Sequence, residues 1–168
     1  MASTPNQSSL QRGFAKHDHA DCIVAAMSAV ETQCADGGLR FTPVRRAVLE
    51  ILLREHRAMG AYAVLEDLSA QGFGSQPPVV YRALDFLVSH GFAHKIERLN
   101  AFIACAAPGH DDTPAFMICR VCDTVAETPS APAREELGRV AEASGFVIER
   151  TVIEAEGVCP GCAEAAPE

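Results

Sequence analysis

The chain has 168 residues, no tryptophan, 6% aromatic residues and a formal net charge of −8. This length suits one domain of ordinary size or two small ones, with a core that is mostly aliphatic. No apolar run approaches the ~20 residues of a membrane-spanning helix, and the polar N-terminus lacks the apolar segment of a signal peptide. We therefore expect a cytoplasmic protein with no membrane partner. Its seven cysteines should stay reduced, which favours metal or redox chemistry over a disulfide framework.

The net negative charge of the chain comes entirely from its C-terminal part. Residues 1–98 contain ten lysines and arginines against ten aspartates and glutamates, whereas residues 99–168 contain four against twelve. A neutral first part can present a basic face to DNA, but it is not a strong electrostatic signature of nucleic-acid binding. Residues 1–16 are polar, and we expect them to form a disordered tail.

Hydrophobic periodicity predicts helices before residue 75. The first covers about residues 18–35, with an apolar stripe formed by Ile23, Val24, Met27 and Val30. The second begins at Thr42 as the N-cap and Pro43 at the first helical position. Its buried face should consist of Val44, Ala47, Val48, Ile51 and Leu52. The third is AYAVLEDLSAQG, which Gly72 ends.

A further helix within Gln76–Lys95 carries a possible DNA-binding pattern. Its buried face should consist of Val80, Leu84, Leu87 and Val88, and Gly91 supplies the left-handed residue that ends it. Its other face presents Tyr81, Arg82, Asp85 and Ser89. An aromatic residue and an arginine near the start of a short helix suit the DNA major groove. Taken alone, the helix is better explained as an ordinary amphipathic helix with a solvated face.

A two-stranded wing is expected to follow the helices. We predict strands over 93–98 and 101–105, joined by a two-residue turn at Leu99-Asn100. In that register His94 faces Cys105, with Cβ atoms roughly 5 Å apart. Closely spaced helices followed by a wing indicate a winged helix-turn-helix domain at 17–98, with the wing continuing to about residue 105.

Residues 99–168 are expected to form a small α/β domain. The segment AFMICRVCDTVAET predicts two strands around a Cys-x-x-Cys turn, and Ser130 would cap a helix over about 131–144. FVIERTVIEAEG, residues 146–157, predicts a further strand. The expected fold class is therefore α+β, an N-terminal winged helix-turn-helix domain followed by a small α/β domain.

Two Cys-x-x-Cys pairs, Cys119/Cys122 and Cys159/Cys162, are the strongest chemical signal. Each pair forms a turn that directs two sulfurs at one point, and two pairs make a tetrahedral thiolate site suited to zinc. One pair alone would leave redox chemistry open. Four thiolates leave no open coordination position, so we expect a structural zinc ion without a catalytic role.

A second candidate cluster lies outside these pairs and comprises His94, Cys105, His110 and Glu127. This set of nitrogen, sulfur and oxygen ligands favours zinc over iron or manganese, because thiolate is a soft ligand. Taken singly, each histidine is more often a solvated or core residue than a ligand, and Asp111 or Asp112 competes with His110.

Two cysteines remain, Cys22 and Cys34. The simpler interpretation is that both are buried helix cysteines. Alternatively, His17, His19 and Cys22 would form an additional weak metal site.

Several of these motifs resemble the ferric uptake regulator superfamily, with the zinc uptake regulators as its most similar branch. They are Thr42-Pro43-x-Arg45, PPVVYRALDFLVSHGFAHKIE, the two Cys-x-x-Cys pairs and VIEAEGVC, and the resemblance covers about residues 18–163. It implies a dimeric metal-sensing repressor with an N-terminal winged helix and a C-terminal dimerisation domain. By position, it also implies two zinc ions per chain. The structural ion would be bound by the four paired cysteines, and the regulatory ion by His94, Cys105, His110 and Glu127.

The resemblance further implies that Tyr81 and Arg82 contact DNA, and we add Arg45 and Arg98 as expected contacts. We therefore expect a zinc-responsive repressor of zinc-uptake genes that binds an A/T-rich inverted repeat as a zinc-loaded homodimer. An iron, manganese or peroxide sensor of the same superfamily is the alternative within this class. A metal-dependent enzyme and a zinc-stapled interaction module are alternatives from other classes, although the sequence contains no convincing nucleophile–base pair or phosphate-binding loop.

Overall fold

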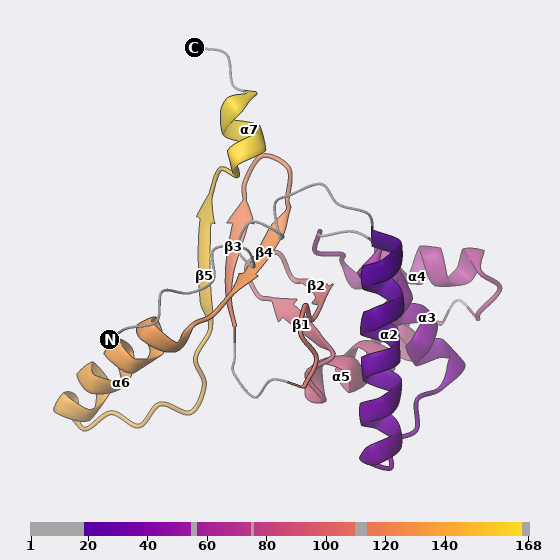
Figure 1. The fold of residues 1–168 in the computed structure, drawn as a ribbon, viewed down its shortest axis with the longest axis horizontal. Coiled ribbons are helices and arrows are strands. Elements are labelled where there is room, and N and C mark those ends of the chain that lie inside the picture. Colours follow the sequence, from indigo (N-terminus) through magenta and orange to yellow (C-terminus); the bar gives the residue numbers. More distant parts are fainter. Residues whose placement is uncertain (1–18, 55–56, 75, 110–113, 166–168) are drawn as a thin grey trace. The chain divides into compact units, whose positions relative to one another are not determined.

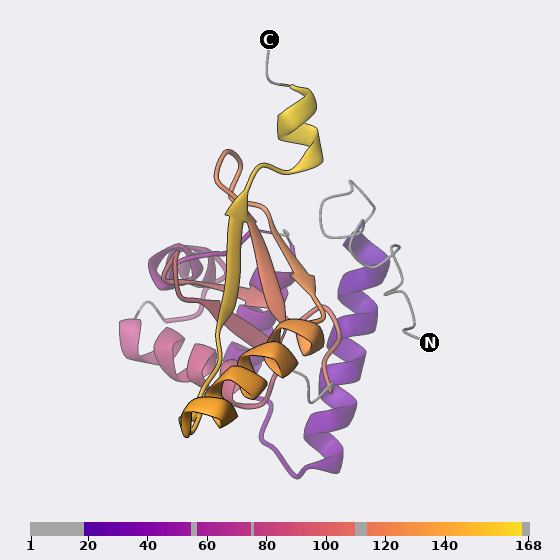
Figure 2. The same ribbon diagram turned by 90° about the vertical axis from the view of Figure 1, so that its left-hand side faces the viewer.

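The computed structural model describes residues 19–54, 57–74, 76–109 and 114–165, without the side chains of residues 19–22. The chain divides into two compact units, Lys16–His110 and Asp111–Glu168. Helices dominate the first unit, whereas the second is built around a sheet (Figures 1 and 2). Among the described residues, no helix combines the length and the apolar character that crossing a membrane requires.

Helices of the first unit pack around one aliphatic core. They are α2 (His19–Asp36), α3 (Pro43–Leu53), α4 (Ala61–Ala70) and α5 (Pro77–Ser89). Each contributes side chains that are at most 1% exposed, including Val30, Val48, Leu52, Val64 and Leu84. Burial of each such side chain stabilises the fold by roughly 1.5–3 kcal/mol, so these helices depend on one another.

The sequence signals at helix ends are confirmed for α3 and α5. The Thr42 hydroxyl accepts a hydrogen bond from the Arg45 backbone N–H at 3.4 Å, and Pro43 is the first helical residue. After α5, Gly91 adopts φ +70, and the Phe92 N–H donates to the Leu87 carbonyl at 2.8 Å. A left-handed residue in this place lets the chain turn into the hairpin while the last helical carbonyls stay hydrogen-bonded.

Two residues that we placed on buried faces are exposed, Val24 at 69% and Val88 at 36%. Val24 lies one turn and a half before Val30, outside the part of α2 that meets the core. On α5, Ala83 and Phe86 are buried as well, so the buried face of the helix is turned away from Val88. The predicted polar residues Tyr81, Arg82, Asp85 and Ser89 are all exposed.

The wing is present, but its predicted register is wrong. Strands β1 (Ala93–Ile96) and β2 (Ala101–Ala104) are antiparallel, and His94 pairs with Ile103 instead of Cys105. Residues 97–100 form a four-residue turn, in which the Asn100 N–H donates to the Glu97 carbonyl at 3.2 Å. Asn100 has φ +47, a conformation that asparagine tolerates better than most residues. The chain lacks the Asn-Gly that favours the two-residue turn.

The second unit contains a mixed sheet whose strand order is β4-β3-β5. Its elements are β3 (Ala115–Cys119), β4 (Val125–Thr128), α6 (Ala131–Ser144), β5 (Ile153–Gly157) and α7 (Pro160–Glu164). The β3–β4 pair is antiparallel and joined by the predicted Cys-x-x-Cys turn, whereas β3 and β5 are parallel. Parallel strands need a long connection, which α6 provides here (Figure 2).

Two details of this unit differ from our expectations. Ser130 precedes α6 as predicted, but its buried side chain makes no capping hydrogen bond to the helix. The strand expected over 146–157 is shorter and begins only at Ile153. Phe146 and Val147 are 68% and 80% exposed, so the alternation that we took for a strand lies partly in a loop.

Candidate metal centre and nucleic-acid interface

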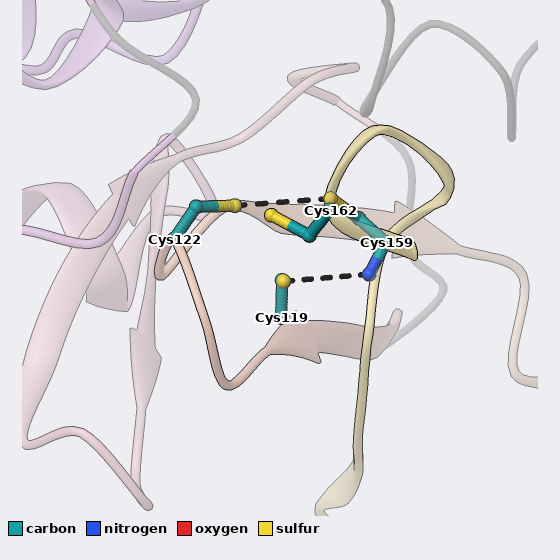
Figure 3. A group of neighbouring side chains, drawn as sticks. All are labelled: Cys119, Cys122, Cys159 and Cys162. Atoms are coloured by element: carbon teal, nitrogen blue, oxygen red, sulfur yellow. Dashed lines mark hydrogen bonds between the residues drawn. The ribbon is translucent and has the colours of Figure 1, made fainter. Parts of the chain in front are cut away.

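Four cysteine side chains converge at one end of the second unit's sheet (Figure 3). Cys119 ends β3, Cys122 lies in the turn before β4, and Cys159 and Cys162 belong to the segment that opens α7. The parallel pairing of β3 with β5 places Cys119 opposite Gly157 and so brings the two Cys-x-x-Cys segments together.

The spacing of the four sulfurs fits a zinc ion. All four Sγ atoms lie within 4.8 Å of one another, and those of Cys122 and Cys159 are 3.8 Å apart. Four tetrahedral sulfurs that each lie about 2.3 Å from zinc are separated by about 3.8 Å. A disulfide would require about 2.05 Å, and all four cysteines are free thiols. The geometry therefore favours a metal site over a redox pair.

Hydrogen bonds to the sulfurs give these thiols different pKa values. The Cys159 backbone N–H donates to Cys119 Sγ at 3.3 Å and, as the largest cause, lowers the pKa of Cys119 to about 6. The Thr124 hydroxyl lies 3.1 Å from Cys122 Sγ and lowers the pKa of that thiol. In contrast, the neighbouring sulfurs of Cys159 and Cys122 raise the pKa of Cys162 to about 12. Sulfurs crowded in this way suit a divalent cation, which stabilises thiolates.

His94 and Cys105 lie close together in the first unit. A ring nitrogen of His94 and Cys105 Sγ are within 4.8 Å of each other. Because His94 pairs with Ile103, Cys105 is its diagonal neighbour on the same face of the hairpin, within reach of a long side chain. The Cys105 N–H donates to the Phe92 carbonyl at 3.0 Å, and the side chain is only 6% exposed.

The remaining predicted metal ligands are less fully described. Glu127 is half-buried on β4 of the second unit. His110, Asp111, Asp112 and His17 lie outside the described residues, as do the side chains of His19 and Cys22. Cys34 is 2% exposed in the core of the first unit, as the simpler interpretation predicts. The additional site at His17, His19 and Cys22 therefore stays a prediction.

The exposed face of α5 borders a groove in the first unit. The groove has a volume of about 640 Å³, and its lining includes Tyr62, Tyr81, Asp85, Val88, Lys95 and Asn100. Tyr81 is 44% exposed and Tyr62, at the start of α4, is 70% exposed. Sequence reasoning missed Tyr62, because an aromatic residue at the start of a helix is not distinctive without knowledge of its neighbours. Arg82, the next residue of α5 after Tyr81, is exposed, and Arg98 is exposed in the turn of the wing.

Arg45 occupies a different environment from Arg82. Its guanidinium lies 3.6 Å from the centre of the Phe86 ring and donates a hydrogen bond to the Arg40 carbonyl. Stacking of this kind contributes about 0.5–2 kcal/mol to stability. Arg45 thus has a structural role in holding α3 against α5, and its contact with DNA stays a prediction.

These features define a class of metal-binding protein in which a winged helix-turn-helix unit is joined to an α/β unit with four converging cysteines. No protein-family model matches the chain. The chain is 36% identical over 141 residues to the zinc uptake regulation protein of Escherichia coli strain K12, covering 82% of this chain and 81% of that protein. It therefore belongs to the zinc uptake regulation protein family.

Solved structures agree with this assignment. A zinc uptake regulator complexed with zinc and DNA superimposes with a TM-score of 0.80 at 34% identity, covering 85% of this chain and 96% of the other. The structure of holo XcZur has a TM-score of 0.75 at 37% identity, covering 82% and 96%. The ferric uptake regulator of Helicobacter pylori has the same fold, with a TM-score of 0.52 at 14% identity.

Proposed function

We propose that the protein is a zinc-responsive DNA-binding repressor of zinc-uptake genes. The observation that carries this proposal is the pair His94 and Cys105, whose ligand atoms approach within 4.8 Å on the hairpin that follows α5. A soft thiolate next to an imidazole suits zinc better than iron or manganese. This pair is separate from the four cysteines of the second unit, so it can bind metal reversibly without loss of the fold.

The protein would bind two zinc ions per chain. The four-cysteine site would hold one ion permanently and stabilise the second unit. The regulatory ion would be bound by His94 and Cys105, with Glu127 and His110 as further ligands and Asp111 or Asp112 as substitutes for His110. When bound, zinc would supply coordination bonds to these ligands and so stabilise the conformation in which they meet.

DNA recognition would use the exposed face of α5 and the wing. Arg82, which is exposed on α5, would read a guanine, and Tyr81 and Tyr62 would offer aromatic surface along the groove that they line. Arg98 in the wing suits a phosphate contact. To shift the protein from 1:99 to 99:1 in favour of the DNA-competent state, zinc must prefer that state by about 5.5 kcal/mol. Coordination bonds that form only in that state can provide such a preference.

The protein would bind an A/T-rich inverted repeat as a homodimer. Support comes from the exposed apolar residues of the second unit, which include Leu137, Val140, Phe146, Val147 and Val152. Large exposed apolar side chains that gather in one small unit are typical of protein–protein interfaces. A dimer would present two recognition helices to successive major grooves.

The proposal is tested by DNA binding with and without zinc. Fluorescence anisotropy with a labelled A/T-rich inverted repeat should report tight binding in zinc, and loss of binding after a chelator removes the weaker-held ion. Metal analysis of protein purified from cells whose growth medium favours no single metal should find zinc. Binding that responds to iron, manganese or peroxide instead would favour the other sensors of the superfamily. No metal-dependent DNA binding at all would contradict the proposal.

A further inference from the structure

The segment that follows Cys105 is held by α2. Gln33 Nε2 donates to the Pro108 carbonyl oxygen at 2.9 Å in a half-buried position, although the two residues are 75 apart in the chain. The next residue, Gly109, adopts φ +96, and a Cβ there would lie 2.7 Å from Gln33 Nε2 and 3.2 Å from Cδ. A side chain at this position would therefore displace the end of the Gln33 side chain, and its backbone conformation is one that residues other than glycine rarely adopt.

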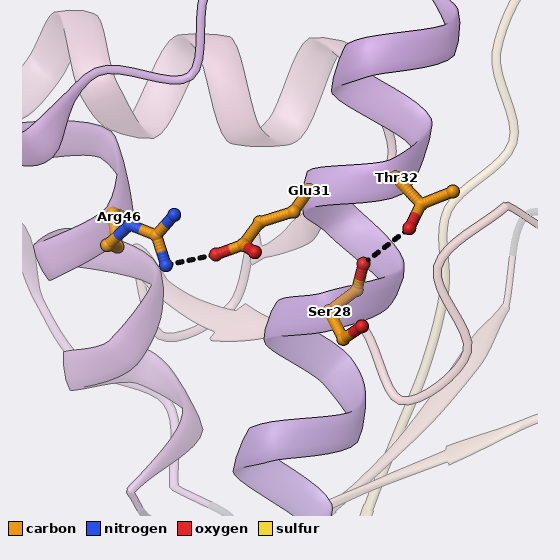
Figure 4. A network of polar contacts seen from close by, with 4 residues as sticks. All are labelled: Ser28, Glu31, Thr32 and Arg46. Carbon is orange, nitrogen blue, oxygen red and sulfur yellow. Dashed lines mark hydrogen bonds and ion pairs between the residues drawn. The ribbon is translucent and has the colours of Figure 1, made fainter.

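The part of α2 that carries Gln33 is firmly attached to the first unit. Val30 and Cys34, which flank Gln33 along the helix, are 0% and 2% exposed. Glu31 also forms an ion pair with Arg46 of α3, as Figure 4 shows. Both charged side chains are more than 40% exposed, so this pair contributes little to stability. Burial of the Val30 side chain contributes more. The part of the helix backbone from which Gln33 projects is thus anchored in the core, and the hydrogen bond to Pro108 orients its amide.

The other end of the same segment is fixed as well. The Cys105 N–H donates to the Phe92 carbonyl at 3.0 Å, which continues the hairpin by one residue. Only residues 106 and 107 lie between Cys105 and Pro108, whose carbonyl accepts the hydrogen bond from Gln33. Ordering a flexible backbone costs conformational entropy, so a segment that is already ordered does not incur that cost when a ligand binds.

We propose that Gln33 is a positioning residue for the regulatory zinc site. Its hydrogen bond to Pro108 holds the segment that follows Cys105, and so presents the Cys105 thiolate next to His94 before zinc arrives. The inference rests on the proposed function, because it concerns the affinity of that zinc site. Gln33 itself does not bind the metal, and the four-cysteine site of the second unit does not depend on it.

The substitution Gln33→Glu tests this role directly. Glutamate keeps the length and helix propensity of glutamine but, when ionised, offers no hydrogen to the Pro108 carbonyl. Titration of zinc chloride against a chelating competitor should show a regulatory site weakened about threefold to tenfold, the effect of one neutral hydrogen bond. The matched control is Thr32→Ala, since Thr32 only donates to the Ser28 carbonyl within α2, at 2.9 Å (Figure 4).

Gly109→Ala provides an independent variant on the other side of the contact, because its Cβ would displace the Gln33 amide. It should weaken the same zinc site, and the double variant should be little worse than Gly109→Ala alone, because this change already removes the hydrogen bond in addition to straining the backbone at φ +96. DNA affinity at saturating zinc should stay at the wild-type value in all variants.

Wild-type zinc affinity in both Gln33→Glu and Gly109→Ala would overturn the inference. So would a loss of DNA affinity that persists at saturating zinc, because it would indicate a purely structural role. If wild-type protein shows no zinc-dependent DNA binding, the proposed function fails instead, and the two failures are thereby distinguished.

Discussion

Cys105 lies diagonally across the β1–β2 hairpin from His94, two residues beyond the Ile103 that pairs with this histidine. Diagonal neighbours share one face of a hairpin, so both side chains project to the same side although their backbones are not paired. A thiolate and an imidazole are thereby held within 4.8 Å of each other outside the four-cysteine site. The separation of these two sites makes distinct outcomes predictable for their variants.

Loss of a sulfur from the four-cysteine site should unfold the second unit. In Cys119→Ser or Cys159→Ser, the binding energy of the structural zinc, which contributes to folding, is lost or much reduced. We expect misfolding or loss of the dimer, measured by circular dichroism, sedimentation and zinc content. The control is Cys34→Ala, which removes a core cysteine of the first unit and should keep all zinc. A Cys119→Ser variant that folds, dimerises and binds DNA at ordinary yield would contradict the assignment.

Removal of the exposed arginine of α5 should weaken DNA binding without affecting metal. If Arg82 reads a guanine, Arg82→Ala should lose roughly 1–3 kcal/mol of specific binding energy with unchanged zinc content and melting temperature. Anisotropy titrations with operator and with unrelated DNA measure the effect. Normal operator binding by Arg82→Ala would rule out α5 as the recognition helix.

Arg45→Ala is the informative comparison, since this arginine stacks on Phe86. It should lower the melting temperature, whereas Arg82→Ala should not.

Zinc should leave the four-cysteine site as the pH decreases, and more steeply below about pH 6. Zinc binds thiolates, so protons compete with it wherever the zinc-free site is protonated. Above its pKa of about 6, Cys119 carries no proton and offers no competition, whereas Cys162, with a pKa of about 12, must release one throughout. Below pH 6 one further proton must be displaced. Competition titrations at several pH values measure this slope, and a slope that stays constant through pH 6 would contradict the expected ionisation of Cys119.

The sequence was sufficient to predict helices α2 to α6, because their signals are local, whereas the short helix α7 was not predicted. Thr42-Pro43 and Pro77 open helices, and Gly91 ends one, through backbone preferences that do not depend on distant contacts. The two Cys-x-x-Cys pairs were equally predictable, since each pair is a turn with its own geometry.

The features that could not be predicted depend on contacts between distant residues or on a turn that the sequence does not mark. The hairpin register was two residues off, because no Asn-Gly marks the turn and Asn100 closes a four-residue loop instead. A shift of one residue would have turned His94 to the opposite face, but a shift of two preserves the face. For that reason the expectation that His94 and Cys105 are neighbours is correct, although the strand pairing from which it was made is wrong. The contact of Gln33 with Pro108 could not be foreseen, because nothing local links residues 75 positions apart.

The claim that His94 and Cys105 belong to the zinc sensor is tested most directly by Cys105→Ser. Serine is a hard and poorly ionised donor, so the regulatory site should lose most of its zinc affinity while the four-cysteine site, fold and dimer persist. The decisive measurement is one zinc titration against a competing chelator, in which bound zinc and operator binding are followed in the same sample. The account predicts one remaining zinc ion per chain and no zinc-dependent DNA binding. Operator binding by Cys105→Ser at the same zinc concentration as the wild type would contradict it.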